Sequence, residues 1–529
     1  MADAKASGHR VDLVDHILEQ DFGDGPEMRL SLQRLSLVLL VVAGLVFAGF
    51  VAVRNVLAST PKLQQTSLIP YVDATNTPLY NFQDPSANLT GQVALGFVVA
   101  QDRTSCTPSW GGAYSLSEAE GALNLSRRIA QYRDIGGKVI VSFGGQAGTD
   151  LAAACPSSTS LKHAYDEVLT TYRTTEIDLD IEGTMVSNTA AVTRAAVALA
   201  SLQGDARRAT HHLGIWVTLP VGEAGLTSDG TRVVNIMLSH HVALAGVNAL
   251  AMDYGSRLPG SSMVTTIESS LSGTETQLAT LFANHHMALS TAQVWNRMGA
   301  TVMIGVNDSA GEQVTIGDAL SLKQFVAQNH LGRISFWSLN RDSQCGSNFA
   351  VLATLSTTCS GVPQRTLQFS SIFNTLGAAG SSPSAPLVTS TTVPPNAKGP
   401  YPTWESQEAY PTGYLVTWHG SVYVARYYSQ GLAPDTPVQY SWQSAWELIG
   451  PVLPGESAPT VTTLPPGTKP AWSPLVGYPQ GSEVLYNGLP YVALFYNQDT
   501  SPGAAAVAPQ YSPWKPLWSY PNEPSTNNG

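Results

Sequence analysis

The stretch Glu176-Ile-Asp-Leu-Asp-Ile-Glu-Gly183 places three carboxylates, Asp178, Asp180 and Glu182, at alternate positions with aliphatic residues between them. A β-strand turns alternate side chains to opposite faces, so this run predicts a strand with one acidic and one aliphatic face. Helical segments flank it, as around a parallel strand whose outer face is covered by helices. The acids then point into a barrel interior, where burying a charge is costly. Such a cluster indicates an acid catalyst rather than a solvated edge strand.

Residues 66–375 alternate short apolar runs with helical segments, which predicts an α/β fold, a (β/α)₈ TIM barrel that forms the catalytic domain. Catalytic residues of such barrels lie at the C-terminal ends of the strands. The acidic run occupies the fourth strand, and Glu182 lies at that end. The eight expected strands are Leu68–Val72, Val93–Val99, Val139–Phe143, Ile177–Ile181, Leu213–Leu219, Val247–Met252, Val302–Val306 and Ile334–Leu339.

Residues 35–57 hold one charged side chain, Arg54, and are about as long as the ~20 apolar residues that a membrane span requires. Arg29 and Arg34 precede this segment, and the positive-inside rule then leaves the N-terminus in the cytoplasm. We therefore expect a cytoplasmic segment at 1–34, a transmembrane anchor at 35–57, and an extracellular catalytic domain held by a single pass through the cell membrane.

The alternative is a signal peptide cleaved after the small residues near Val56 and Ala58, with secretion of the remaining chain. A signal peptide has a short charged head and an apolar core of roughly 7–15 residues, and this head is longer. The anchor is therefore preferred, and both alternatives export the rest of the chain.

The formal charge of −11 and the pI near 5.4 argue against a nucleic-acid partner, which would require a basic surface. No cofactor motif is found, and the pairs of adjacent histidines do not share one face as metal ligands would. The four cysteines lack metal-ligand spacing, so disulfides are expected. Proximity along the chain pairs Cys106 with Cys155 and Cys345 with Cys359.

Two stretches rich in Ser, Thr and Pro, at 376–400 and 452–469, read as linkers. They separate two modules, 401–451 and 470–518, which are related by a shift of 68 residues and read as small all-β domains. The shift superposes several aromatic residues, which we expect to supply much of each core: Trp404 on Trp472, Tyr410 on Tyr478, and Trp446 on Trp514.

The acidic run resembles the D-x-D-x-E signature of glycoside hydrolase family 18, the chitinases and their relatives. Three further segments lie in register with that family: Ser142-Phe-Gly-Gly145 ends the third strand, Met252-Asp-Tyr254 ends the sixth, and Trp337 ends the eighth. This resemblance covers the whole barrel. It implies hydrolysis of chitin with retention, in which the 2-acetamido group of the substrate acts as the nucleophile.

The resemblance also implies a role for each catalytic residue. Glu182 protonates the glycosidic oxygen, and the like charge of Asp180 raises its pKa. Asp180 orients the acetamido group and stabilises the oxazolinium-like intermediate. Asp178 lies deeper and shares a proton with Asp180, so that the two titrate as a unit. Tyr254 hydrogen-bonds the acetamido group.

Trp337 and Met252 are expected to shape the pocket of the acetamido group. Many relatives place an aspartate directly after the tyrosine, where this chain has Gly255, and the nearby acid is Asp253 before it. We include Asp253 among the substrate-binding residues. Trp110, in a Trp-Gly-Gly loop after the second strand, is an expected platform for a sugar ring.

The two tail modules resemble chitin-binding modules of carbohydrate-binding family 5/12. In each, an aromatic pair follows the shared Tyr-Val-Ala triplet: Tyr427-Tyr428 in the first copy and Phe495-Tyr496 in the second. Aromatic rings stack on the apolar faces of sugars, and two tethered modules add avidity. We expect these pairs to bind chitin, although a role in the core is the alternative.

The sequence therefore predicts a chitinase whose partners are chitin or N-acetylglucosamine oligosaccharides, with no metal and no cofactor. Two other functions remain open. One is a non-catalytic chitin-binding lectin or adhesin on the same fold, against which the presence of Glu182 argues. The other is hydrolysis of another glycan that contains N-acetylglucosamine, such as peptidoglycan or an N-glycan.

Overall fold

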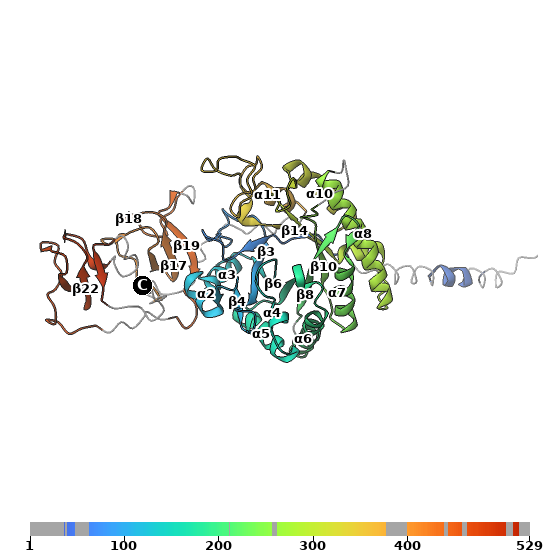
Figure 1. The fold of residues 1–529 in the computed structure, drawn as a ribbon, viewed down its shortest axis with the longest axis horizontal. Coiled ribbons are helices and arrows are strands. Elements are labelled where there is room, and N and C mark those ends of the chain that lie inside the picture. The colour runs from blue at the N-terminus through green and yellow to red at the C-terminus, as the bar shows by residue number, and fades with distance from the viewer. Residues whose placement is uncertain are drawn as a thin grey trace, which may run out of the picture. The chain divides into compact units, whose positions relative to one another are not determined.

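The computed structural model describes residues 36, 40–47, 63–210, 212–255, 262–376, 399–438, 443–456, 463–503 and 512–517. The chain divides into two compact units, Met1–Lys62 and Leu63–Gly529. Nearly all described residues belong to the second unit, which holds the parallel sheet (Figure 1).

The single-pass membrane placement expected from residues 35–57 is wrong. Among the residues that the structure describes, no helix combines the length and the apolar character that a bilayer crossing needs. Of the expected segment, residue 36 and residues 40–47 are described, and its other residues, like all of 1–34, lie outside the described residues.

The parallel strands of the second unit hydrogen-bond in the order β1-β14-β11-β10-β8-β7-β6-β3, and β2 pairs with the other edge of β3. Because β1 and β2 are consecutive parts of one extended segment, these two pairings bring the ends of the sheet together, as in a TIM barrel. The strands are β1 (Ser67–Leu68), β2 (Tyr71–Asp73), β3 (Gln92–Ala100), β6 (Lys138–Gly144), β7 (Glu176–Asp180), β8 (Gly214–Gly222), β10 (Gly246–Leu250), β11 (Met298–Met303) and β14 (Arg333–Trp337).

All eight expected strands are present, although the seventh lies a few residues earlier in the chain than predicted. Helices lie outside these strands, and Figure 1 shows α5, α6, α7 and α8 along one side of the sheet. They are α2 (Leu116–Ala122), α3 (Leu125–Asp134), α4 (Leu151–Ala154), α5 (Ser158–Tyr172), α6 (Thr189–Arg208), α7 (Ser228–Ser239), α8 (Met263–Asn284), α9 (Thr291–Asn296), α10 (Ile316–Asn329) and α11 (Gln368–Asn374).

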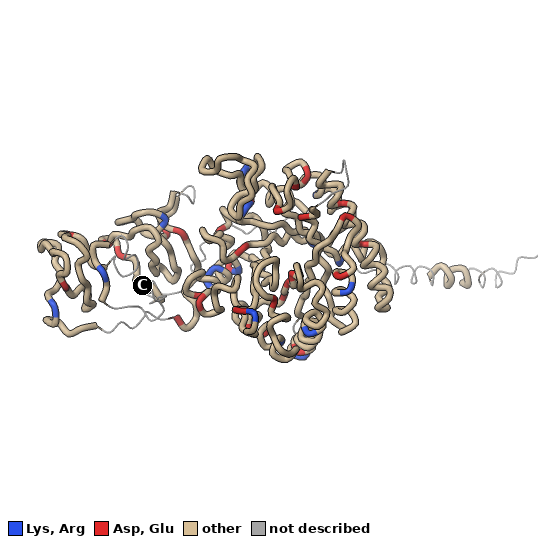
Figure 2. The backbone as a smooth tube through the Cα atoms, in the orientation of Figure 1, with Lys and Arg blue, Asp and Glu red and all other residues tan. Residues whose placement is uncertain are grey.

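Short strands extend the loops of the barrel: β4 (Pro108–Trp110), β5 (Tyr114–Ser115), β9 (Gly225–Leu226), β12 (Gly305–Val306) and β13 (Gln313–Val314). One continuous apolar core joins the outer faces of the strands to the helices. Charged residues of both signs are scattered thinly over the backbone (Figure 2), in keeping with a charged fraction of 12%.

The sequence repeat is also a structural repeat. Each copy folds as a three-stranded antiparallel sheet beside a two-stranded one. The strands are β15 (Ala409–Tyr410), β16 (Leu415–Trp418), β17 (Ser421–Ala425), β18 (Ser429–Gln430) and β19 (Trp446–Pro451) in the first copy. In the second they are β20 (Gly477–Tyr478), β21 (Glu483–Tyr486), β22 (Leu489–Ala493), β23 (Asn497–Gln498) and β24 (Trp514–Pro516). Each copy has its own small aromatic core.

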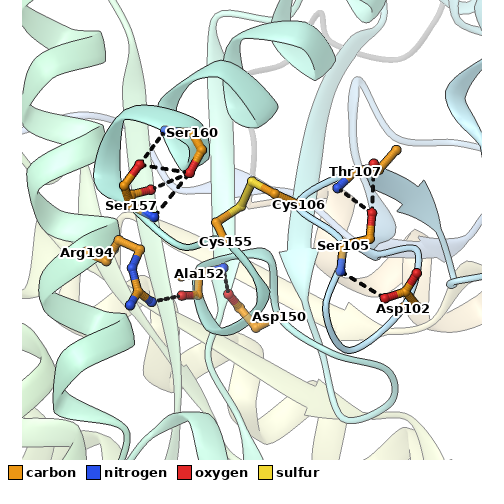
Figure 3. The surroundings of a disulfide bond; sticks show 10 residues. All are labelled: Asp102, Ser105, Cys106, Thr107, Asp150, Ala152, Cys155, Ser157, Ser160 and Arg194. Carbon is orange, nitrogen blue, oxygen red and sulfur yellow. Dashed lines mark hydrogen bonds between the residues drawn. A yellow bond between two sulfur atoms is a disulfide. The ribbon is translucent and has the colours of Figure 1, made fainter.

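Both expected disulfides are confirmed, between Cys106 and Cys155 and between Cys345 and Cys359. The first joins the loop after β3 to the end of the short helix α4 (Figure 3). Asp150 caps that helix by accepting the backbone N–H of Ala152 at 2.6 Å. Arg194, from α6, donates to the carbonyl oxygen of Ala152. The bridge therefore anchors a segment that follows β6 on the catalytic side of the barrel.

Removing this bridge with the double substitution Cys106→Ala/Cys155→Ala should lower the free energy of unfolding. A disulfide restricts the unfolded chain more strongly when it closes a longer loop. The loops here span 49 and 14 residues, so losses of about 4 and about 3 kcal/mol are expected for the two bridges. Urea unfolding followed by tryptophan fluorescence, with Cys345→Ala/Cys359→Ala in parallel, measures both. A larger loss from the shorter loop would contradict the entropic account.

Candidate active site

Strand β7 has the two faces that its alternation predicts. Asp178 and Asp180 point into the barrel with exposed fractions of 0% and 3%, while Ile177 and Leu179 are buried on the side of the helices. Glu182 follows the strand, at the position before the 3₁₀ turn η1 (Gly183–Met185), and is half-buried. The three acids therefore form a line from the barrel interior to its mouth, and their environments differ.

Asp178 is surrounded by hydrogen-bond donors. Its Oδ1 accepts from Thr218 Oγ1 at 2.6 Å and from Arg333 Nη1 at 2.9 Å. Its Oδ2 accepts from Ser142 Oγ at 2.7 Å and from the Tyr71 hydroxyl at 2.8 Å. Burial raises the pKa of Tyr71 well above its ordinary value, so this hydroxyl keeps its proton and donates. The donors come from four different strands, and they satisfy both oxygens of the buried carboxylate.

The side chains that bind Asp178 form a buried polar layer, and Asn248 extends this layer across the barrel. Asn248 of β10 donates its amide to Thr218 Oγ1 at 3.0 Å and to Thr301 Oγ1 at 2.7 Å. Arg333 donates its Nε to Ser335 Oγ at 2.7 Å. Strands on opposite sides of the barrel are thus linked through side chains that are all buried. Replacing any one leaves a polar partner unsatisfied, which is costly in a dry interior.

The Gly144-Gly145 pair at the end of β6 lets the backbone approach the acidic strand. Gly144 has φ +97°, and a Cβ there would clash with the carbonyl oxygen of Asp180. Gly145 donates its backbone N–H to that same oxygen at 2.9 Å. A side chain at Gly144 would displace Asp180, and a side chain at Gly145 would clash with the ring of Phe97, so both glycines have a structural role at the end of β6.

Asp180 lies next to Asp178 along the line of acids but has few partners. Burial is the largest cause that raises its pKa well above the ordinary value, followed by the negative charges of Glu182 and Asp178, while Arg333 opposes the rise. Among the described residues, its Oδ1 is buried without a hydrogen-bond partner. A buried carboxyl of this kind is stable as the neutral acid and is available to pair with a group that enters the site.

Glu182 is the acid closest to solvent. Burial raises the pKa of Glu182 to about 7, with smaller contributions from the negative charges of Asp253 and Asp308. Asp180 and Glu182 also repel one another as like charges, because the charge of Glu182 raises the pKa of Asp180. That the charge of Asp180 raises the pKa of Glu182 stays a prediction. A carboxyl with this pKa is protonated at neutral pH in a substantial fraction of molecules and can donate its proton.

Asp253 lies where the sequence places it, after β10. Its Oδ1 accepts the backbone N–H of Ser309 at 2.8 Å, which joins the loop after β10 to the β12–β13 loop. Asp308 belongs to that second loop. Together the two acids give the mouth of the barrel a negative field beside Glu182.

The hydroxyl group of Tyr254 already has a partner within the protein. It lies 2.8 Å from Ser270 Oγ of α8, and Ser270 in turn donates to the carbonyl oxygen of Ile267. The Tyr254 hydroxyl therefore donates to Ser270, and only its lone pairs remain for a ligand. Glu312, which is 2% exposed, accepts the backbone N–H groups of Tyr254 and Gly255 at 3.1 and 2.9 Å.

Trp337 ends β14 and is half-buried, as expected for a ring that borders a pocket. Its ring stacks on Phe97, with centroids 5.4 Å apart and planes 19° apart, and Tyr71 packs against both. This aromatic cluster connects the half-exposed Trp337 to the Tyr71 hydroxyl that contacts Asp178. Met252 is half-buried just after β10, a strand that β11 separates from β14.

Trp110 is not a sugar platform, which corrects the sequence-based expectation. Its side chain is 0% exposed and belongs to the main apolar core. The indole N–H donates to the Tyr172 hydroxyl at 2.9 Å, and the two rings meet edge to face. A ring that is fully enclosed has no face to offer a ligand, so Trp110 stabilises the packing of β4 on α5.

Sequence analysis missed several residues that the fold brings to the acids. Four of them are single polar residues within apolar strands: Tyr71, Thr218, Asn248 and Arg333. Such a residue indicates a functional site only when it is known which side chains of the strand point into the barrel. Glu312 and Asp308 lie in a loop without any motif. The signal for Arg333 was available: a charged residue at the start of an otherwise buried strand is rarely there without a partner.

Comparison with curated proteins finds two relatives, each of which matches about half of this chain. One is the "Probable bifunctional chitinase/lysozyme" of Escherichia coli (strain K12), 32% identical over 291 residues. The other is "Endochitinase 11" of Metarhizium anisopliae, 32% identical over 282 residues. The matches cover 53% and 52% of this chain, but only 31% and 52% of the respective relatives. No family model matches the chain.

Among solved structures, the catalytic domain of a hyperthermophilic chitinase from Pyrococcus furiosus aligns with 60% of this chain and 96% of its own, at 24% identity and a TM-score of 0.49. The curated relatives give the stronger comparison, because both are 32% identical to this chain over 291 and 282 residues. Their similarity to this chain supports a glycoside hydrolase.

Proposed function

We propose that the barrel hydrolyses β-1,4 linkages between N-acetylglucosamine units of chitin, with retention of configuration at the anomeric carbon. The proposal rests mainly on the different environments of the three acids. Glu182, with a pKa raised to about 7, lies at the mouth, directly above the buried acid Asp180. The names of the two curated relatives support chitin as the substrate.

In the first step, protonated Glu182 donates its proton to the glycosidic oxygen, and the bond from the anomeric carbon to that oxygen breaks. Neither aspartate is available as the nucleophile, because both lie buried below the mouth and Asp178 is fully hydrogen-bonded. The carbonyl oxygen of the substrate's 2-acetamido group attacks the anomeric carbon instead, as in substrate-assisted glycosidases. Asp180 accepts the acetamido N–H with its unpartnered oxygen and so orients the acetamido group toward the anomeric carbon.

In the second step, water attacks the anomeric carbon, and Glu182, now a carboxylate, takes up its proton. Displacement twice at the same carbon gives net retention. Trp337 and Met252 border the acetamido pocket, and the lone pairs of the Tyr254 hydroxyl accept a hydrogen bond from the substrate. Asp253 binds hydroxyl groups of the sugar beside the scissile bond.

Glu182→Gln should lower the rate of hydrolysis of N-acetylglucosamine oligomers about 10²–10⁴-fold, because the amide cannot donate a proton as the acid does. Binding of the oligomers should persist. The matched control is Glu167→Gln, the same change on the exposed face of α5. Product release and anomeric configuration are measured on chitin oligomers, peptidoglycan and a glycoprotein. Undiminished hydrolysis by the Glu182 variant would contradict the proposal. Hydrolysis of peptidoglycan or of the glycoprotein, without hydrolysis of chitin oligomers, would show that chitin is not the substrate.

Hydrolysis should fall as the pH rises through about 7, because Glu182 must be protonated to act as the acid. Asp308→Asn removes one of the negative charges that raise this pKa, so the alkaline side of the kcat profile should move to lower pH by about half a unit. Asp166→Asn, on the exposed face of α5, is the control. If the alkaline side of the profile does not move in a correctly folded Asp308→Asn variant, the charge of Asp308 does not affect the pKa of Glu182.

We further infer that the repeats at 401–451 and 470–518 are chitin-binding modules. Tyr427, Tyr428, Phe495 and Tyr496 are 44%, 62%, 57% and 64% exposed. Trp446 and Trp514 are buried, at 3% and 0%, and so belong to the cores of the modules. Exposed aromatic faces at matching positions of both copies suit stacking on sugar rings.

Replacing both residues of one aromatic pair by alanine should weaken binding to insoluble chitin about tenfold, and replacing both pairs should weaken it further through lost avidity. Hydrolysis of soluble oligomers should not change. Leu475→Ala, at a side chain that is 86% exposed in the second copy, is the matched control. Sedimentation with chitin powder measures the bound fraction, and full retention by the four-residue variant would assign these rings no role in binding.

A further inference from the structure

The loop that follows β10 has an unusual backbone conformation. Asp253 has φ +53° and Gly255 has φ +75°, so both residues lie in the left-handed region that favours glycine. A residue with a side chain is strained in this region and remains there only when its surroundings hold it. Tyr254 lies between these two residues, and Asp253 is one of the acids beside Glu182. The contacts that hold this loop therefore affect the mouth of the barrel.

Glu312 supplies two of these contacts. Its Oε2 accepts the backbone N–H of Tyr254 at 3.1 Å, and its Oε1 accepts the backbone N–H of Gly255 at 2.9 Å. A third hydrogen bond joins the same two loops, from the backbone N–H of Ser309 to Asp253 Oδ1 at 2.8 Å. Glu312 is 2% exposed, so its carboxylate needs partners inside the protein, and the two N–H groups provide them.

The segment that carries Glu312 is fixed to the barrel. Asn307 donates its backbone N–H to the carbonyl oxygen of Glu312 at 3.0 Å, and Glu312 donates its own to the carbonyl oxygen of Ser309 at 3.1 Å. The side-chain amide of Asn307 donates to the carbonyl oxygens of Met303 and Gly305, at 2.9 Å each. Because Met303 ends β11, Glu312 holds the loop after β10 against the neighbouring strand of the sheet.

We propose that Glu312 is a positioning residue: its carboxylate holds the left-handed loop after β10 in place and thereby sets where Tyr254 and Asp253 meet the substrate. This role rests on the proposed function, in which both of these residues contact the sugar. The hydroxyl of Tyr254 is held separately by Ser270 of α8, so Glu312 fixes the backbone end of this residue. Glu312 is itself enclosed and acts only through the residues that it holds.

Two accepting oxygens are required for this role. In Glu312→Gln the amide has a single oxygen, and its NH₂ group points a donor at one of the two backbone N–H groups. Glu312→Asp keeps the charge but is shorter by one methylene group, so it cannot reach both N–H groups at once. Each variant therefore loses at least one of the two hydrogen bonds.

Hydrogen exchange measures these hydrogen bonds without any assay of activity. In the unmodified full-length protein, the backbone amides of Tyr254 and Gly255 should exchange slowly. At least one of them should exchange about tenfold faster in Glu312→Gln, because a lost hydrogen bond makes local opening easier. Mass spectrometry with fragmentation at single residues resolves the two amides. Glu167→Gln, on the exposed face of α5, is the matched control and should leave both rates unchanged.

Unchanged exchange at both amides in folded Glu312→Gln would overturn the proposal. If Glu312→Gln folds poorly, Glu312→Asp gives the same test with the charge retained, and the same rise in rate is expected at one amide. Equal rates at both amides in Glu312→Asp and in the unmodified protein would also overturn the proposal.

The pH dependence of turnover gives a second readout, which a merely structural role would not change. Charged groups from several elements surround Glu182. They are Asp180 on β7, Asp253 after β10 and Asp308 after β12, with Arg341 near the last two. The position of the loop after β10 decides how close the charge of Asp253 lies to Glu182.

Release of this loop in Glu312→Gln takes the charge of Asp253 away from Glu182, which lowers the pKa of Glu182. The alkaline side of the kcat profile should therefore move to lower pH. The value of kcat/KM on soluble N-acetylglucosamine oligomers should fall about 10–100-fold, because the groups that contact the substrate are misplaced. An alkaline side that stays in place in folded Glu312→Gln would overturn the proposal.

The double variant Asp253→Asn/Glu312→Gln separates this route from a direct effect of the charge of Glu312 on Glu182. Asp253→Asn alone should move the alkaline side to lower pH, and the addition of Glu312→Gln should move it no further. An additional shift as large as in the single variant would overturn the proposal. Failure of the proposed function would be seen differently, as absent turnover in the unmodified protein while Glu312→Gln still speeds exchange in the loop.

Discussion

The structure depends on one buried interaction, the ion pair between Asp178 and Arg333 at the centre of the barrel. A carboxylate in this position is tolerated only because a cation and three hydroxyl groups satisfy it. Those partners come from four different strands, so the need to satisfy one buried carboxylate determines which polar side chains point inward from each of those strands. The barrel is consequently held by a polar layer as well as by its apolar core, and that layer lies directly beneath the acids.

The polar layer explains how neighbouring acids on one strand acquire different properties. Asp178 has every acceptor position occupied, Asp180 has a buried oxygen without a described partner, and Glu182 reaches the mouth. Alternation along a strand cannot produce this difference, because it treats the three positions alike. The difference arises from what the other strands and loops place around each carboxyl. Catalytic acids are commonly separated in this way by their environments.

The acidic field at the mouth has a different origin from the polar layer. Asp253 and Asp308 belong to loops after β10 and β12, and a backbone hydrogen bond joins those loops. Glu312 fixes the same region by accepting two backbone N–H groups at Tyr254 and Gly255. This arrangement puts negative charge beside Glu182 although the position after the tyrosine is a glycine. Loops on a rigid barrel can thus supply a charge from a different position in the chain.

Local patterns in the sequence were sufficient for much of the protein. The alternation at 176–183 predicts both faces of β7, the short range between the cysteines predicts both disulfides, and the shift of 68 residues predicts two modules with matching strands. The seventh strand was displaced because Met298-Gly-Ala-Thr301 is less apolar than the residues that follow. Only the tertiary structure decided that Arg333 meets Asp178, that Asp308 lies beside Glu182, and that Trp110 is enclosed. The physical reason is that sequence periodicity determines which way a side chain points along its own strand, whereas its partners are determined by the closure of the barrel, which joins residues far apart in the chain.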